Sequence, residues 1–142
     1  MSNNDYDTEE FESRQVYGNS APITAFMNDE IIGVEPTASL REAAVALENG
    51  GVGCIIVGTA ENVEGVVSER DILRAVAKGL DLDETPVSTV ESTHLKWATP
   101  ESTVGEVVGE MMNNYVRHVL VGENSTLIGM VHMRDMLAAY LP

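Results

Sequence analysis

The apolar positions of the chain fall into a repeated order of short runs and one-sided segments. Leu40, Ala43, Ala44 and Leu47 recur at helical spacing and predict an amphipathic helix. Short continuous apolar runs between turn residues predict buried strands. The expected elements of the first stretch are Ile31–Val34, Leu40–Glu48, Val52–Val57, Val63–Val67 and a helix from Ser68 to about Ala77. Those of the second stretch are Leu95–Ala98, Val104–Asn113, Val116–Val121, Leu127–Val131 and Met133–Tyr140.

The second stretch is a copy of the first at an offset of 64 residues, which places Asp135 on Asp71. The run GVVSERDIL at residues 65–73 returns as GMVHMRDML at 129–137, without a gap. Ser39 and Glu42 have capping-box spacing, and the second copy repeats it. Both copies therefore predict the order β-α-β-β-α, and two such units have to bury each other's faces. We expect a mixed α/β (α+β) fold of two repeats packed with pseudo-two-fold symmetry.

The repeat sets the expected domain boundaries. Residues 21–80 form the first repeat and residues 81–142 the second. Residues 1–20 carry five acids and few apolar side chains, which predicts a disordered or loosely docked acidic tail. An arm that binds a partner is the alternative for this segment. Met111 and Met112 are expected to fill the core.

The charge of the chain excludes some classes of partner. Eight basic residues stand against 23 acidic ones, for a net charge of −15. Nucleic-acid binding needs clustered Lys and Arg, so it is not expected. Such a balance is typical of proteins from salt-loving microbes, and a mildly acidic mesophilic protein with an acidic tail is the alternative.

Membrane and disulfide signals are missing from the sequence. No run of 18 apolar residues is present, which argues against a membrane span, and the N-terminus does not have the pattern of a secretory signal. One cysteine, Cys54, excludes an internal disulfide and lies within an apolar run, so we expect a buried thiol. A cytoplasmic location fits these features.

The repeated motifs resemble a known family. The opening Pro-x-x-Ser-Leu-Arg-Glu-Ala, the ending Gly-Val-Val-Ser-Glu-Arg-Asp-Ile-Leu and the order β-α-β-β-α are similar to the cystathionine β-synthase (CBS) domain. A tandem pair resembles a Bateman module, and the resemblance covers residue 21 to the C-terminus. It implies adenosine-containing ligands bound in two clefts between the paired domains. It also implies a module that dimerises and regulates a protein partner.

The resemblance assigns one site to the first helix start. Ser68 and Asp71 would hold a ribose, because a carboxylate can accept hydrogen bonds from both vicinal hydroxyls. The same spacing also suits a simple helix cap. Thr99, Val116 and the backbone near Arg117 would flank the base. The phosphate position falls at Gly53 and Cys54 and has no basic side chain. Arg70 could compensate, or could be solvated or ion-paired.

The second site is built around Asp135. Val52 and Gly53 would line the base and Asp135 would hold the ribose. Arg117 and His118 occupy the strand start where cationic phosphate ligands are often found, and His118 could respond to pH. His132 replaces the serine, so we expect the capping pair to be lost there, while Arg134 and Asp135 remain. The two sites should therefore differ.

These features favour a regulatory sensor that binds an adenosyl nucleotide and shifts the conformation or assembly of a homodimer, with energy sensing as its role. The ligand could be AMP, ADP, ATP, S-adenosylmethionine or NAD, and the regulated partner is not identified. A structural dimerisation module with degenerate sites is the alternative. No catalytic motif or metal-ligand spacing is visible, so we expect neither an enzyme nor a metal site nor a required cofactor.

Overall fold

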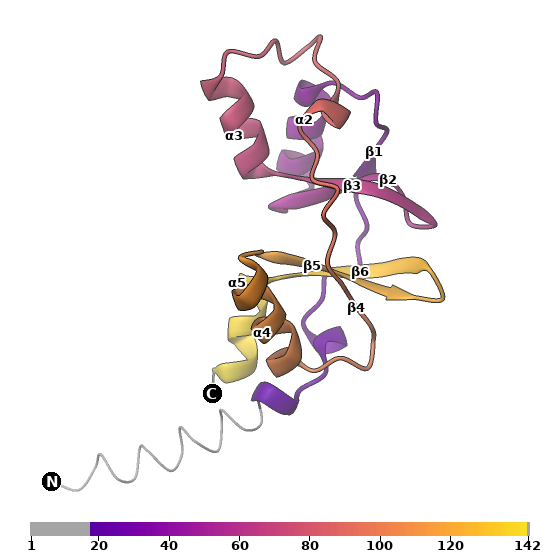
Figure 1. The fold of residues 1–142 in the computed structure, drawn as a ribbon, viewed down its shortest axis with the longest axis vertical. Helices are drawn as coiled ribbons and strands as arrows, with labels where there is room; N and C mark the ends of the chain where they lie inside the picture. The colour runs from indigo at the N-terminus through magenta and orange to yellow at the C-terminus, as the bar shows by residue number, and fades with distance from the viewer. Residues whose placement is uncertain (1–17, 142) are drawn as a thin grey trace, which may run out of the picture. The chain divides into compact units, whose positions relative to one another are not determined.

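The computed structural model describes residues 18–141, which divide into two compact units (Figure 1). Residues 30–96 and 124–128 form the first unit. The second unit consists of residues 18–29, 97–123 and 129–141. Each unit is built around a three-stranded sheet. Most of the predicted acidic tail, residues 1–17, lies outside the described residues.

The first sheet has the strand order β1-β2-β3. β2 (Cys54–Thr59) lies at its centre, parallel to β1 (Gly33–Val34) and antiparallel to β3 (Asn62–Ser68). The first four residues of this central strand are apolar, and all four are buried. The accompanying helices are α2 (Leu40–Gly50), α3 (Glu69–Ala77) and the short η2 (Val87–Thr89).

The second sheet repeats this arrangement with the order β4-β5-β6. Its strands are β4 (Trp97–Ala98), β5 (His118–Glu123) and β6 (Thr126–His132), and β4 runs parallel to β5. Its helices are η1 (Ile23–Ala25), α4 (Val104–Asn114), α5 (Met133–Met136) and η3 (Leu137–Tyr140). The mixed α/β class and the order β-α-β-β-α are thus confirmed.

The single helix predicted over Met133–Tyr140 is wrong, because the chain changes to a 3-10 helix at Leu137. Leu141, with a ψ of 152°, is already extended. Pro142 follows it, and a proline disfavours the helical conformation of the residue before it. The last turn therefore tightens, as is common where no further helical hydrogen bonds can follow.

The predicted capping box is complete at the start of α2, whereas at the start of α4 only its Thr103 half is formed. Ser39 Oγ accepts the N–H of Glu42 at 3.1 Å, and Glu42 Oε2 accepts the N–H of Ser39 at 3.3 Å. In α4, Thr103 Oγ1 accepts the N–H of Glu106 at 3.3 Å. Such caps satisfy backbone groups that have no partner within the helix, which explains why both helices begin where they do.

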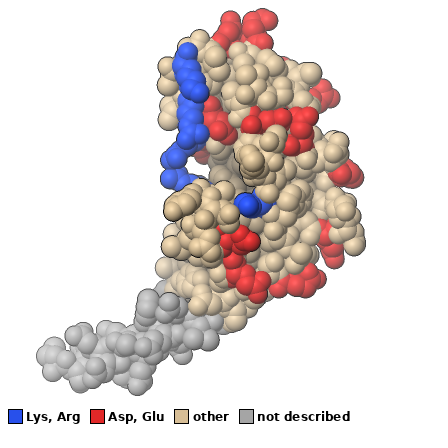
Figure 2. Space-filling view, in the orientation of Figure 1, with Lys and Arg blue, Asp and Glu red and all other residues tan. Residues whose placement is uncertain are grey.

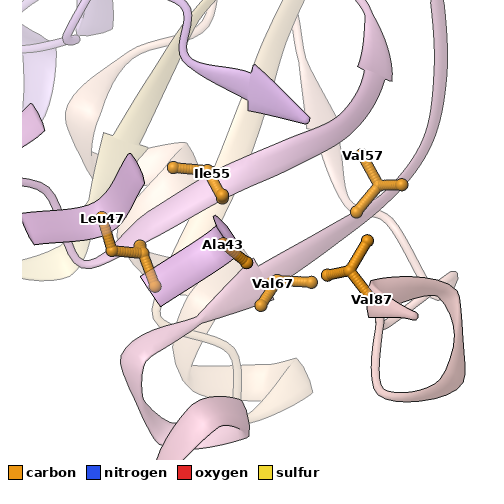
Figure 3. Packing of buried hydrophobic residues seen from close by; sticks show 6 residues of the cluster. All are labelled: Ala43, Leu47, Ile55, Val57, Val67 and Val87. Carbon is orange, nitrogen blue, oxygen red and sulfur yellow. The ribbon is translucent and has the colours of Figure 1, made fainter. Parts of the chain in front are cut away.

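The core of the first unit is a layer of side chains between the sheet and α2 (Figure 3). Leu47 and Ala43 project from α2 towards Val67 of β3 and Ile55 of β2. Val57 and Val87 complete this cluster. Each of these side chains is at most 5% exposed, so the cluster supplies much of the hydrophobic stabilisation of the unit.

The core positions of the second unit follow the same pattern. Val107 and Met111 of α4 are buried, as are Val119 and Val121 of β5. Met112 is 66% exposed, so its predicted place in the core is wrong. At 100° per residue, a helical neighbour of the buried Met111 cannot share its face. Among residues 18–141 no helix is long and apolar enough to cross a membrane.

Each unit is completed by the segment that precedes the first strand of the other unit. The N–H of Ile23 donates to Ser102 at 3.1 Å, and Ile23 is fully buried in the second unit. Its counterpart Val87, also fully buried, donates to Ala38 at 2.7 Å in the first unit. Residues 85–92 therefore belong to the first unit although they follow the first repeat in the sequence.

After η2 the chain pairs with β3 and brings two carboxyl groups together. Val66 and Ser92 exchange backbone hydrogen bonds of 3.0 and 2.9 Å. A Cβ on Gly65 would lie 2.7 Å from Glu91 Oε2, so the Glu91 side chain covers this glycine. Oε2 is buried and has no hydrogen-bond partner within residues 18–141. Burial and the neighbouring Glu64 carboxyl raise the pKa of Glu91 to about 7.

The equivalent place at the second sheet is apolar. Met27 and Ile128 occupy the positions of Glu91 and Glu64 at the 64-residue offset. A Cβ on Gly129 would lie 2.6 Å from Met27 Sδ, so the thioether covers that glycine as the carboxyl covers Gly65. An apolar side chain is thus compatible with this backbone, and the acidic pair is specific to the first unit.

Replacement of Glu91 by Met should remove a pH dependence of stability. A carboxyl whose pKa is higher in the folded than in the unfolded chain stabilises at low pH, and this contribution is lost as pH rises from about 4.5 to about 7. Relative to Glu91→Met, the wild type should lose on the order of 1 kcal/mol of unfolding free energy over this window, after allowance for solvent screening. Urea unfolding at a series of pH values measures it.

The exposed Glu84 provides the matched control. Glu84→Met makes the same change of side chain away from the Glu64–Glu91 pair and should leave the pH dependence as it is in the wild type. If Glu91→Met and wild type keep a constant difference in unfolding free energy from pH 4.5 to 7, the acidic pair does not titrate as described.

Candidate functional site

The junction of β3 and α3 holds the first group of predicted ligand residues. Ser68 is the N-cap of α3, and its hydroxyl accepts the N–H of Asp71 at 3.3 Å. Asp71 Oδ2 accepts two bonds in return, from the Ser68 N–H at 2.8 Å and from its hydroxyl at 3.0 Å. The capping function that the spacing allowed is therefore present.

The cap leaves only part of Asp71 for a ligand. Oδ2 already accepts two hydrogen bonds, which fills its capacity. The other oxygen, Oδ1, lies 3.9 Å from Arg74 Nη1, and the side chain is 19% exposed. Oδ1 is therefore the atom that can receive a ligand hydroxyl, while the Ser68 hydroxyl is engaged within the cap.

The start of β2 lies beside this junction. The carbonyl of Gly53 accepts the N–H of Glu69, the first residue of α3, at 3.0 Å. Gly53 and the half-buried Val52 are thus brought next to Ser68 and Asp71 within one unit. Arg70 projects from α3 as an exposed side chain and makes no ion pair within the described residues. This cation is therefore available for an anion.

Cys54, the first residue of β2, is the nearest side chain with redox chemistry. It is buried, which confirms the predicted structural thiol. Burial, together with the charge of Asp71, raises the pKa of the thiol to about 12. Because the thiolate is the reactive form, Cys54 is inert at neutral pH.

The junction of β6 and α5 holds the second group. His132 Nδ1 accepts the N–H of Arg134 at 2.9 Å, and Asp135 Oδ2 accepts the N–H of His132 at 3.3 Å. The prediction that histidine abolishes the capping pair is thus wrong. A neutral imidazole has one unprotonated nitrogen, and Nδ1 lies close enough to the backbone to accept as a serine hydroxyl does.

His118 lies against this cap at the start of β5. Its ring meets the His132 ring edge to face, with 4.4 Å between the ring centres. His118 Nε2 is buried without a hydrogen-bond partner in the described part of the chain. Burial lowers the pKa of His118 to about 4, with smaller contributions from the charges of His132, Arg117 and Arg134. The ring is therefore neutral near pH 7, and its response to pH lies in the acidic range.

Arg117 is the available cation of the second unit. Its carbonyl accepts the N–H of Met133 at 2.8 Å, the counterpart of the Gly53–Glu69 bond in the first unit. Its side chain is exposed and makes no ion pair within residues 18–141. Arg117 and His118 thus lie next to the residue group that contains His132, Arg134 and Asp135.

Other predicted residues fall in different units. Thr99 donates its N–H to Ser102 Oγ at 3.1 Å, and Val116 donates its N–H to Met111 at 3.0 Å, both within the second unit. The predicted Asp71 site combines Thr99 and Val116 with a residue of the first unit. The predicted Asp135 site likewise combines Val52 and Gly53 with a residue of the second unit. Both assignments stay predictions. No group of three metal-ligating side chains occurs among the described residues.

The titration of His118 predicts acid sensitivity of the second unit. A histidine whose pKa is lower in the folded than in the unfolded chain destabilises as pH falls from about 6.5 to about 4, because the unfolded chain takes up the proton first. Relative to His118→Gln, the wild type should lose on the order of 1 kcal/mol over this window, after allowance for water near the ring. His94→Gln, at an exposed histidine, is the control. Parallel unfolding curves of wild type and His118→Gln at all pH values would contradict this.

Comparison with known proteins identifies the repeated unit. The family model described as the CBS domain matches residues 23–78 and again residues 87–142. The two matches are displaced by the 64 residues that relate the repeats in the sequence. Together they cover most of the chain, so the motifs at the two helix starts belong to one type of domain.

Relatives and a solved structure agree with this match. An uncharacterized 17.7 kDa protein of Acidianus ambivalens is 33% identical over 110 residues, which are 76% of this chain and 66% of that one. The CBS domain-containing protein YhcV of Bacillus subtilis is 31% identical over 111 residues, 78% of this chain and 79% of YhcV. The CBS domain protein PAE2072 of Pyrobaculum aerophilum, solved in complex with AMP, has a TM-score of 0.72 at 30% identity and covers 80% of this chain and 88% of its own. The chain belongs to the CBS domain family and carries two copies of the domain in tandem.

Proposed function

We propose that the chain is a regulatory module that binds adenosine nucleotides of the AMP, ADP and ATP class. The observation that carries the proposal is the pair of capped helix starts, in which Asp71 Oδ1 is available beside exposed Arg70, and Asp135 lies beside Arg117. The 30% identical protein from Pyrobaculum aerophilum is complexed with AMP, which supports this ligand class. S-adenosylmethionine and NAD share the adenosine group and remain within the proposal.

The two sites use different residues for the ribose and the phosphate of the ligand. At the first site the ribose contact is Asp71 Oδ1, and Arg70 is the cation for a phosphate. At the second site Arg117 faces the phosphate, and neutral His118 supplies no charge because the pKa of its ring is lowered to about 4. A phosphorylated ligand should therefore depend on one arginine at each site, and adenosine itself on the carboxylates.

Ligand binding acts on the partner through a difference in affinity between two states of the module. In this role the chain regulates a protein partner and is not itself catalytic. The alternative is a structural module whose ligand sites have degenerated. The two differ in whether the wild-type chain binds a nucleotide at all, which a titration decides.

Asp71→Ala should weaken AMP binding. The change removes the carboxylate that would receive a ribose hydroxyl, which costs on the order of 1.5–3 kcal/mol, or about 10- to 150-fold in affinity. Because Asp71 also caps α3, the variant's unfolding free energy has to be compared with that of the wild type first. Asp29→Ala, at an exposed aspartate outside both junctions, is the matched control. Isothermal titration calorimetry with AMP and with adenosine measures both constants.

Arg117→Ala should discriminate between the two ligands. It should weaken AMP much more than adenosine, since the guanidinium pairs with the phosphate. Lys96→Ala removes an exposed charge elsewhere and should change neither. Undiminished AMP binding in both Asp71→Ala and Asp135→Ala, or no binding by the wild type, would leave the structural module as the better description.

We also propose that the chain forms a homodimer through the second unit. Met112 of α4, Leu137 of η3 and Leu141 are each more than half exposed, at 66%, 59% and 66%. Large apolar side chains left exposed in this way can mark an interface between subunits.

Met112→Asp should shift the chain towards the monomer, because a charge in an apolar interface has to be desolvated. Light scattering should give about twice 15.3 kDa for the wild type and a lower mass for Met112→Asp at the same concentration. Asn113→Asp adds the same charge at the next, exposed position and is the control. A wild-type mass equal to one chain would rule out the dimer.

A further inference from the structure

One face of α3 is basic in a protein that is otherwise acidic. Arg70, Arg74 and Lys78 follow one another at intervals of four residues and are all exposed. Residues at this spacing lie on one side of a helix. Figure 2 shows Lys and Arg side chains gathered in a column on the side where Figure 1 draws α3, whereas Asp and Glu are scattered over the rest of this view. We call Arg70, Leu73, Arg74 and Lys78 the α3 face.

The face also carries an apolar side chain. Leu73 is 68% exposed and lies between the basic residues, one turn from Arg70 and next to Arg74. Val76, at the margin of the face, is 53% exposed. Asp71 approaches Arg74 only to 3.9 Å and is engaged in the helix cap. The α3 face thus offers both charge and apolar contact.

The fold does not require this face. At the 64-residue offset, Arg74 and Lys78 correspond to Ala138 and Pro142, so only Arg134 matches a basic residue of the first repeat. The favourable position of cations near a helix C-terminus accounts for Arg74 and Lys78, and the proposed phosphate contact accounts for Arg70, but neither accounts for the exposed Leu73. A basic and partly apolar surface that is present in one repeat and missing from the other calls for a partner.

The chain itself contains a segment of complementary chemistry. Residues 1–17 include the acids Asp5, Asp7, Glu9, Glu10 and Glu12. Tyr6 and Phe11 lie among these acids and can cover an exposed leucine. We propose that the α3 face binds residues 1–17 of the same chain, with carboxylates on Arg74 and Lys78 and an aromatic ring on Leu73, which leaves Arg70 to the nucleotide.

The covalent link between residues 1–17 and the rest of the chain favours their binding to the α3 face. Seventeen residues can span up to about 55–60 Å, and a compact domain of this length has a radius of gyration of only about 14 Å. The length of the segment is therefore compatible with a contact on α3. A linked segment also acts at an effective concentration that reaches the millimolar range, which favours it over a free acidic peptide.

A spin label tests the contact in the full-length chain. Ser2→Cys supplies the attachment site, because burial raises the pKa of the Cys54 thiol to about 12 and keeps it unreactive. A nitroxide on residue 2 should broaden the amide signals of residues 69–78 in nuclear magnetic resonance spectra. Arg74→Glu/Lys78→Glu should reduce the ratio of bound to unbound segment on the order of tenfold and restore those signals. Lys96→Glu, the control, should leave the broadening in place.

A charge exchange separates binding from damage to the helix. Glu9→Lys/Glu10→Lys should also release the segment, and its combination with Arg74→Glu/Lys78→Glu should restore the broadening. The proposal is overturned if residues 69–78 are not broadened in the wild type, or if the exchange does not restore contact. It is also overturned if broadening occurs only between spin-labelled and isotope-labelled chains in a mixture, since a second copy would then supply the segment.

Discussion

In both repeats one backbone hydrogen bond joins the start of the central strand to the start of a helix. Glu69 donates to Gly53 at 3.0 Å in the first unit, and Met133 donates to Arg117 at 2.8 Å in the second. The donor is one of the helix N–H groups that have no partner within the helix, so the bond satisfies it and fixes the helix direction at once. This bond keeps the start of the strand beside the helix start at each junction.

The same backbone supports different chemistry in the two units. Gly53 and Cys54 of the first become Arg117 and His118 of the second, and Ser68 becomes His132. Both helix starts remain capped, because a hydroxyl and a neutral imidazole can each accept a backbone N–H. The repeats are therefore equivalent in fold but unequal in charge, burial and capacity for ligands.

The local features of the fold could be predicted from the sequence, and the long-range ones could not. The box of Ser39 and Glu42 was predictable because its donors and acceptors lie three residues apart. The packing of Ile23 into the second unit and Val87 into the first was not, since each depends on strands distant in the sequence. The cap by His132 was missed because its acceptor depends on tautomer and ring position, which the sequence does not specify.

The carboxyl pair of the first unit could have been found by aligning the two repeats. Glu91 and Glu64 replace Met27 and Ile128 at matching positions, a signal already present in the aligned copies. Its consequence depends on burial, which raises the pKa of Glu91 to about 7 while that of His118 falls to about 4. The first shift makes folding less stable as pH rises from about 4.5 to about 7, and the second makes it less stable as pH falls from about 6.5 to about 4. The two effects oppose each other over most of this range, so a nearly flat wild-type profile would conceal two titrating sites that only single-site variants can separate.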